Sequence, residues 1–144
     1  MISFVSSVEL PAPPEIAWAF VVDHGETIEP LRFTPQGTQG VGTLNRLSGR
    51  IAGVPIRGLS RTVEWDPPNR CVFESVTPSW PVRTRITETF EPSSSGTRHS
   101  IRYEIVSRGL VGRVAAPIFG RLMERSRRLY QERLRAALEA TNRS

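Results

Sequence analysis

The residues of this chain best suited to chemistry lie on one strand-like stretch, residues 97–107. Side chains alternate between the two faces of a strand, so every second residue here shares a face: His99, Ile101, Tyr103 and Ile105. That face is the apolar one, which predicts that the imidazole and the phenol point inward. Two interpretations follow. His99 and Tyr103 are packed core residues, or they are a pair of hydrogen-bonding groups in a cavity.

Glu88 is the acidic residue whose position matters most, because strand alternation places its carboxylate on the predicted inner face. In the stretch 82–90 it shares that face with Ile86 and Phe90. An isolated buried carboxylate is expensive to keep ionised. Either a one-residue bulge turns Glu88 outward, or it is a cavity group paired with an arginine or a histidine. The same ambiguity holds for Glu64 and Glu74.

The chain contains no recognisable catalytic or metal-binding motif. His24 and His99 are its only histidines and Cys71 is its only cysteine, which leaves no metal-ligand spacing. Nucleophile-elbow, phosphate-loop and dinucleotide patterns are also missing. We therefore expect no metal and no cofactor, and the sequence leaves open whether the protein is an enzyme.

Short strands and turns fill the chain as far as residue 107. Residues 2–10 have the pattern of a strand, prolines end it, and a short helix that carries Trp18 follows. A second short helix is predicted around residues 28–33. Strands then alternate with turns at intervals of roughly 10–15 residues, which is typical of an antiparallel meander. Trp80, in a proline-flanked loop, is a candidate for a cavity entrance.

The segment Gly109–Ala140 is predicted to be one long amphipathic helix. Pro117 lies inside it and should kink the helix or split it. Ser126 lies on the apolar side, where it either bonds to its own backbone or faces a ligand. The predicted sheet-facing stripe consists of Val111, Val114, Ala115, Ile118, Leu122 and Leu129, widened on one side by Phe119, Met123, Tyr130 and Leu134.

Length and charge favour a single domain of ordinary composition. The 144 residues carry a net charge of +5, and all 19 basic residues are arginines dispersed along the chain. No aromatic residues interleave with them, so nucleic-acid binding is not expected. The start lacks a signal-peptide pattern, and no apolar run approaches the length of a membrane span. We expect a cytoplasmic monomer or homodimer without stable membrane insertion.

Five segments, in this order and spacing, resemble a known superfamily. They are Val8–Trp18, Gly40–Thr43, Val63–Arg70, Gly96–Arg98 and Gly109–Pro117. Together they are similar to the START-like (SRPBCC) proteins, in the branch named polyketide cyclase/dehydrase and lipid transport. The resemblance implies an α+β helix-grip fold, in which a curved antiparallel sheet wraps around a long C-terminal helix, with two short helices after the first strand. It also implies a deep apolar cavity between sheet and helix, and it supplies no fixed catalytic motif.

The expected function is therefore binding or carriage of a hydrophobic small molecule, such as a lipid, a polyketide or another apolar metabolite. A cyclase/aromatase-like enzyme and a protein–protein interaction module are the alternatives. The residues expected to form the ligand site are Ile86, Glu88, Phe90, His99, Ile101, Tyr103, Ile105, Phe119, Leu122, Met123 and Ser126.

Overall fold

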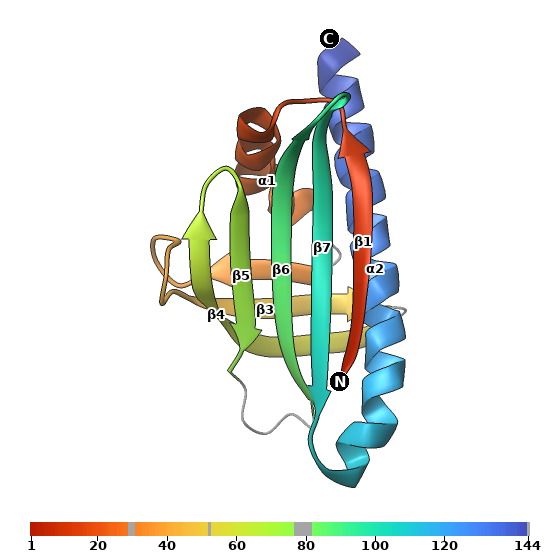
Figure 1. The fold of residues 1–144 in the computed structure, drawn as a ribbon. Helices are drawn as coiled ribbons and strands as arrows, with labels where there is room; N and C mark the ends of the chain where they lie inside the picture. The colour runs from red at the N-terminus through yellow and green to blue at the C-terminus, as the bar shows by residue number, and fades with distance from the viewer. Residues whose placement is uncertain (29–30, 52, 77–81, 144) are drawn as a thin grey trace.

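A computed structural model describes residues 1–28, 31–51, 53–76 and 82–143. Its described part contains a seven-stranded antiparallel sheet, in the order β1-β7-β6-β5-β4-β3-β2, and two helices (Figure 1). The elements are β1 (Ile2–Leu10), α1 (Pro14–Ile28), β2 (Leu31–Pro35), β3 (Leu44–Ile51), β4 (Val54–Asp66), β5 (Arg70–Ser75), β6 (Val82–Ser93), β7 (Gly96–Ser107) and α2 (Gly109–Arg143). The expected curved sheet and long C-terminal helix are confirmed. Within the described ranges, no helix is long and apolar enough to cross a membrane.

The predicted second short helix is wrong. Its region instead contains β2, which pairs with β3 from Leu31 opposite Gly49 to Pro35 opposite Asn45. Leu31 is buried, Arg32 is exposed and Phe33 is half-buried, which is the two-residue period of a strand. Pairing with β3 outweighs the weak local helix pattern, and one helix, α1, follows the first strand.

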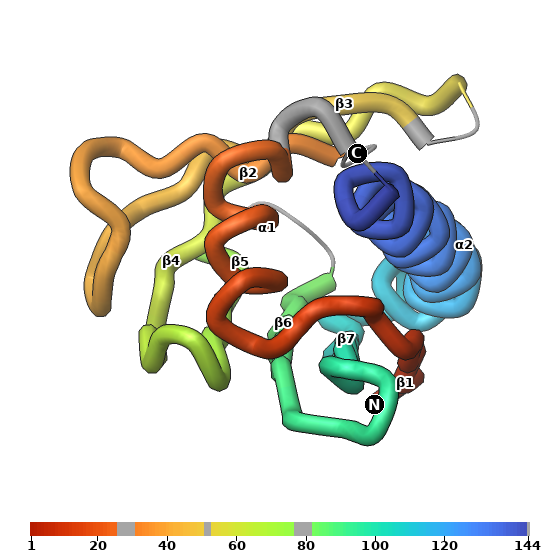
Figure 2. The backbone as a smooth tube through the Cα atoms, turned by 90° about the horizontal axis from the view of Figure 1, so that it is seen from above, coloured from red at the N-terminus to blue at the C-terminus, as the bar shows by residue number. Residues whose placement is uncertain are grey.

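Both helices lie on the concave side of the sheet. Figure 2 shows the strands curving around that side, with α1 next to β2 and β6 and α2 next to β1. The long helix packs mainly on β1 and β7, while α1 contacts β6, β2 and α2. The interior therefore has a sheet as one wall and two helices as the others.

The β6 ladders run without a register shift on either side, so strand alternation holds along this strand. Glu88 consequently lies on the inner face and is buried. The bulge in this sheet lies in β4 instead, between Thr62 and Glu64. Glu64 and Glu74 are both half-exposed and form ion pairs with Arg70 and Arg85, on neighbouring strands.

The predicted sheet-facing stripe of α2 is wrong over its first part and at Leu129, which is 38% exposed. Val111, Val114 and Ile118 are 61–71% exposed, and the helix buries Gly112, Ala116 and Gly120 there instead. A Cβ atom on Gly120 would lie 3.3 Å from the Ile105 side chain, so small residues let the helix approach β7 closely. Close approach, rather than hydrophobicity, therefore sets which face of the helix is buried. The helix also continues through Pro117 without splitting.

Candidate functional site

The interior contains a cavity of about 260 Å³ between α1, the sheet and α2. Its walls are mostly apolar and aromatic, and the charged residues in the described part of its lining are Glu88 and Arg127. The lining residues are Trp18, Val21, Val22, Gly25, Phe33, Pro35, Gln39, Trp65, Cys71, Phe73, Ile86, Glu88, Phe90 and Arg127.

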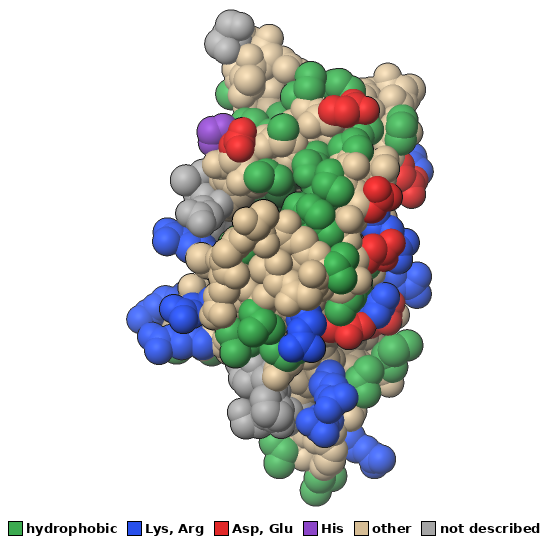
Figure 3. Space-filling view, turned by 90° about the vertical axis from the view of Figure 1, so that its left-hand side faces the viewer, with side chains coloured by type: hydrophobic (Ala, Val, Ile, Leu, Met, Phe, Trp, Pro, Cys, Tyr) green, Lys and Arg blue, Asp and Glu red, His purple; other side chains and the backbone are tan. Residues whose placement is uncertain are grey.

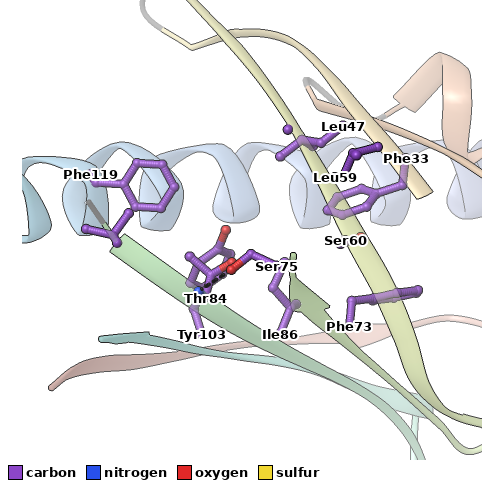
Figure 4. A pocket seen from close by; sticks show the side chains of 12 residues that line it. Phe33, Leu47, Leu59, Ser60, Phe73, Ser75, Thr84, Ile86, Tyr103 and Phe119 are labelled. Atoms are coloured by element: carbon purple, nitrogen blue, oxygen red, sulfur yellow. Dashed lines mark hydrogen bonds between the residues drawn. The ribbon is translucent and has the colours of Figure 1, made fainter. Parts of the chain in front are cut away.

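A smaller hollow of about 30 Å³ lies next to this cavity and shares Phe33, Phe73 and Ile86 with it. Figure 4 shows Phe119 projecting from α2 opposite the strand side chains Thr84 and Tyr103 at this hollow. Burial raises the pKa of Tyr103 to about 12, against the opposing effects of the Arg127 charge and a hydrogen bond to Thr84. The phenol is therefore protonated at neutral pH and acts as a neutral hydrogen-bonding group.

Ring-to-ring contacts hold the aromatic walls of the cavity in place. Trp18 on α1 meets Trp65 on β4 and Phe90 on β6 edge-on, with ring centroids 5.0 and 5.2 Å apart. Phe33 on β2 lies 5.7 Å from Phe73 on β5. Such edge contacts add about 0.5–1.5 kcal/mol each beyond the area they bury. The pocket walls are therefore largely formed before any ligand arrives.

Glu88 and His99 form a buried pair at the inner end of the cavity. The His99 Nε2 atom lies 2.7 Å from Glu88 Oε1, and the Tyr130 hydroxyl donates to the same oxygen over 3.3 Å. These partners come from β6, β7 and α2, so the sheet and the long helix meet at this carboxylate. Both hydrogen bonds reach Oε1, and the described residues offer no hydrogen bond to Oε2.

Gln131 determines which nitrogen of His99 carries the proton. Its Nε2 donates to the Ser6 backbone carbonyl over 2.9 Å, and its Oε1 accepts from the Ser6 hydroxyl. A backbone carbonyl only accepts, so this atom of the amide must be the NH₂ group. The same NH₂ lies 3.1 Å from His99 Nδ1, which must therefore accept. Nε2 is therefore the ring nitrogen that donates to Glu88.

Three surrounding groups keep the Glu88 carboxyl ionised despite its burial. Burial alone raises its pKa, but the hydrogen bond and the electrostatic attraction from His99, the nearby positive charge of Arg127 and the Tyr130 hydroxyl together lower it below the ordinary 4.5. The Arg127 guanidinium carbon lies 5.5 Å from the Tyr130 ring and 5.9 Å from the Phe33 ring. The cavity thus presents the carboxylate of Glu88 and the guanidinium of Arg127 among aromatic walls.

A family model described as polyketide cyclase / dehydrase and lipid transport matches residues 1–139. The chain belongs to this family. Comparison with curated proteins yielded no match.

Solved structures share the fold of this polyketide cyclase/dehydrase family member over nearly its whole length. The aromatase/cyclase Zhui from Streptomyces sp. R1128 is 16% identical, with a TM-score of 0.78, over 96% of this chain and 93% of that one. The protein TTHA0849 from Thermus thermophilus is 22% identical, with a TM-score of 0.76, over 97% and 99%. The di-domain ARO/CYC BexL from the BE-7585A biosynthetic pathway is 19% identical, with a TM-score of 0.73, over 94% of this chain and 49% of that one. At these identities the likeness shows the fold alone.

The structure brings only some of the expected site residues of this family member to the hollow interior. Ile86, Glu88 and Phe90 line the larger cavity, and Tyr103 and Phe119 line the smaller hollow. His99 reaches the cavity only through Glu88. Ser126 is buried and accepts a long hydrogen bond from Arg127 rather than lining either space. The others pack in or against the core away from both linings: Ile101, Ile105, Leu122 and Met123.

Sequence reasoning missed the opposite wall, which is formed by α1, β2, β4 and β5. The local pattern assigns Phe33 to a helix, and that assignment hides the strand alternation that turns its ring inward. Arg127 is one of several arginines on α2, and nothing in the sequence separates it from its exposed neighbours. Trp80, the candidate for a cavity entrance, lies outside the described residues.

Glu88→Gln is expected to reduce stability at neutral pH and to have a smaller effect as the pH falls. A carboxyl whose pKa is lower in the folded state adds stability above its unfolded pKa, and this stability disappears as the pH falls through the folded value. The free energy of unfolding in urea, measured between neutral pH and about pH 3, should therefore converge for wild type and variant. The exposed Glu91 on the same strand provides the control Glu91→Gln. A gap that stays constant with pH would contradict the ionised, paired state of Glu88.

Proposed function

We propose that this protein binds a small aromatic or alicyclic molecule in the cavity and holds one of its hydroxyl groups at Glu88. One observation carries the proposal: an aromatic cavity of about 260 Å³ contains the buried carboxylate of Glu88, which His99 and Tyr130 hold in place. Membership of a family described by polyketide cyclisation and lipid transport agrees with an apolar guest.

The cavity volume favours a compact ligand over a long acyl chain or a sterol. A dry cavity of about 150 Å³ in another protein accepts benzene, and typical drug-sized pockets begin near 300 Å³. A space of about 260 Å³ therefore suits a molecule of about two or three fused rings. Burial of its apolar surface, at about 25 cal/mol per Å², supplies most of the affinity.

The positions of the polar groups in the cavity define where a ligand carries its polar groups. Glu88 Oε1 already accepts two hydrogen bonds, which leaves Oε2 to accept one from a phenol, enol or alcohol. Arg127 lines the same cavity and is a donor and a cation, so it favours a carbonyl or another acceptor on the ligand. A hydroxylated aromatic ketone combines both features on a flat frame.

Titration with 1-naphthol and 1-methoxynaphthalene tests the hydroxyl preference, with quenching of Trp18 and Trp65 emission as the signal. Both compounds bury similar apolar area, but only the naphthol donates a hydrogen bond to Glu88. Leaving a buried polar group unpaired costs about 1–3 kcal/mol, so naphthol should bind at least about fivefold more tightly. Equal affinity would contradict the role of Glu88, and the absence of binding by either compound would contradict the proposed function.

Glu88→Gln should reverse this preference, because His99 donates to position 88 and holds the amide oxygen toward itself. The amide NH₂ then faces the cavity, and an acceptor site becomes a donor site. The variant should bind naphthol more weakly than wild type, and it should bind 1-tetralone, a ketone acceptor, more tightly. Glu91→Gln, the matched exposed variant, should leave all affinities unchanged.

A second candidate is catalysis of cyclisation or aromatisation on a polyketide-type substrate, which the same Glu88–His99 pair favours. A carboxylate held beside an oriented imidazole is a geometry suited to proton transfer. The lowered pKa of Glu88, however, makes it a weak proton acceptor, so binding is the better supported function. Turnover of a poly-β-ketone analogue that Glu88→Gln abolishes, with binding retained, would favour the catalytic candidate.

A further inference from the structure

The first three turns of α2 carry an exposed apolar stripe that the core does not use. The stripe consists of Leu110, Val111, Val114 and Ile118, which are 61–79% exposed. On the opposite face of the same turns, the buried residues are Gly112 and Ala116. This part of the helix is largely inverted: except for Phe119, its large apolar side chains face outward, and its small ones face the protein.

The charge along this stretch of the sequence has one sign. No acidic residue occurs between Glu104 and Glu124, while Arg108, Arg113 and Arg121 lie in that interval. Arg113, Arg121 and Arg125 are exposed and form no ion pair with an acidic residue in the part of the chain that the structure describes.

The rest of α2 is different. Farther along the helix, Arg128 pairs with Glu124 at 2.6 Å, and Arg135 pairs with Glu139 at 3.0 Å. Figure 3 shows hydrophobic and basic side chains at the lower end of the face it draws, the end at which α2 begins in Figure 1. Among the described residues, the unpaired cations of the helix are therefore concentrated beside its exposed apolar residues.

We propose that this end of the molecule docks onto the surface of an anionic lipid bilayer. A helix that presents apolar side chains between arginines lies in a membrane interface, with the apolar residues among the acyl chains and the guanidinium groups at the phosphates. The first turns of α2 have this arrangement. Docking of this kind is peripheral, in agreement with the lack of any membrane-spanning helix among the described residues.

A second copy of the chain is a poorer occupant of the same surface. In a two-fold dimer through the exposed stripe, the same surface patch of both copies meets. Each residue then lies near the equivalent residue of the other copy, or near a neighbour of that residue. Arg113 and Arg121 of one copy would then face the same arginines of the other. Like charges in that position oppose association, whereas lipid phosphates neutralise them.

Vesicle co-sedimentation tests the proposal on the whole protein. Vesicles of phosphatidylcholine and phosphatidylglycerol in equal amounts should bind it, and vesicles of phosphatidylcholine alone should not. Leu110→Ser with Ile118→Ser should weaken binding at least about tenfold, because both side chains lose their apolar contact. Arg113→Gln with Arg121→Gln should weaken it about fivefold per arginine, and added salt should have a similar effect.

The matched control is Val5→Ser with Ile16→Ser, two side chains of similar exposure (61% and 57%) on β1 and α1. This variant should bind vesicles like wild type, and circular dichroism should show that all the variants fold. Equal binding of wild type and the Leu110/Ile118 variant, or no binding to anionic vesicles, would overturn the proposal. So would a wild-type dimer that the Leu110/Ile118 variant breaks up while vesicle binding stays unchanged.

Discussion

Leu134→Asp is expected to abolish the cooperative fold. Leu134 is 0% exposed on the sheet-facing side of α2, where it belongs to the main hydrophobic core. The substitution removes a large apolar side chain and places a carboxylate in a site without a compensating partner. Such changes cost more than about 4–5 kcal/mol, against a typical total stability of about 5–15 kcal/mol. Near-ultraviolet circular dichroism should lose its fine structure, and thermal unfolding should lose its sharp transition.

Leu129→Asp on the same helix is the matched control. Leu129 is 38% exposed, so its carboxylate stays hydrated and the variant should unfold cooperatively, close to the wild-type temperature. If the two variants behaved alike, Leu134 would not lie on the face of α2 that packs on the sheet.

Gly96→Ala is expected to destabilise the protein by about 3 kcal/mol or more. Gly96 starts β7 with φ at +135°, and a Cβ atom there would lie 2.6 Å from the Leu10 carbonyl oxygen and 2.7 Å from the Ala12 nitrogen. These are backbone atoms, so they cannot move aside as a flexible side chain would. The side chain of the neighbouring Thr97 donates a hydrogen bond to the Ala12 carbonyl. The close approach of β7 at this point therefore also holds the start of α1 in place. Urea unfolding measures the loss.

Gly42→Ala separates backbone strain from the steric clash. Gly42 also has a positive φ, +91°, but a Cβ atom there would meet nothing within 4 Å. Its cost should be only the strain of a left-handed conformation, about 1–2 kcal/mol. A loss at Gly96 no larger than that at Gly42 would contradict the close approach of β7 to the strand–helix junction.

The inward face of β6 and β7 could be predicted from the sequence because a strand has a strict two-residue period. Glu88, His99 and Tyr103 are all buried as alternation requires. The two-residue alternation holds throughout β6 because its pairing with β7 is continuous from Val82 to Ser93. The sequence left open whether a buried Glu88 pairs with an arginine or a histidine. In the structure its partner is His99.

The buried face of α2 could be predicted only in part: Met123, Tyr130 and Leu134 are buried as expected, but hydrophobicity was the wrong guide over the first turns. The helix lies so close to the sheet that Gly112, Ala116 and Gly120 face it at one end. Farther along, the buried polar residues Arg127 and Gln131 face the interior. There Gln131 forms a hydrogen bond with His99, and the charge of Arg127 lowers the pKa of Glu88. Gln131 contacts Ser6, a residue 125 positions earlier, and no local pattern encodes such a contact.

The pairing of β1 with β7 also sets an order of events during protein synthesis. β1 emerges from the ribosome early, yet its only partner strand among the described residues, running from Thr97 to Ile105, is translated much later. Until then both of its edges are unpaired, and an unpaired strand edge is a site for wrong association. The Glu88 site is completed later still, because Tyr130 and Gln131 follow β7. A nascent chain that stalls before α2 would therefore expose its cavity wall to chaperones, with the carboxylate still unpartnered from the helix side.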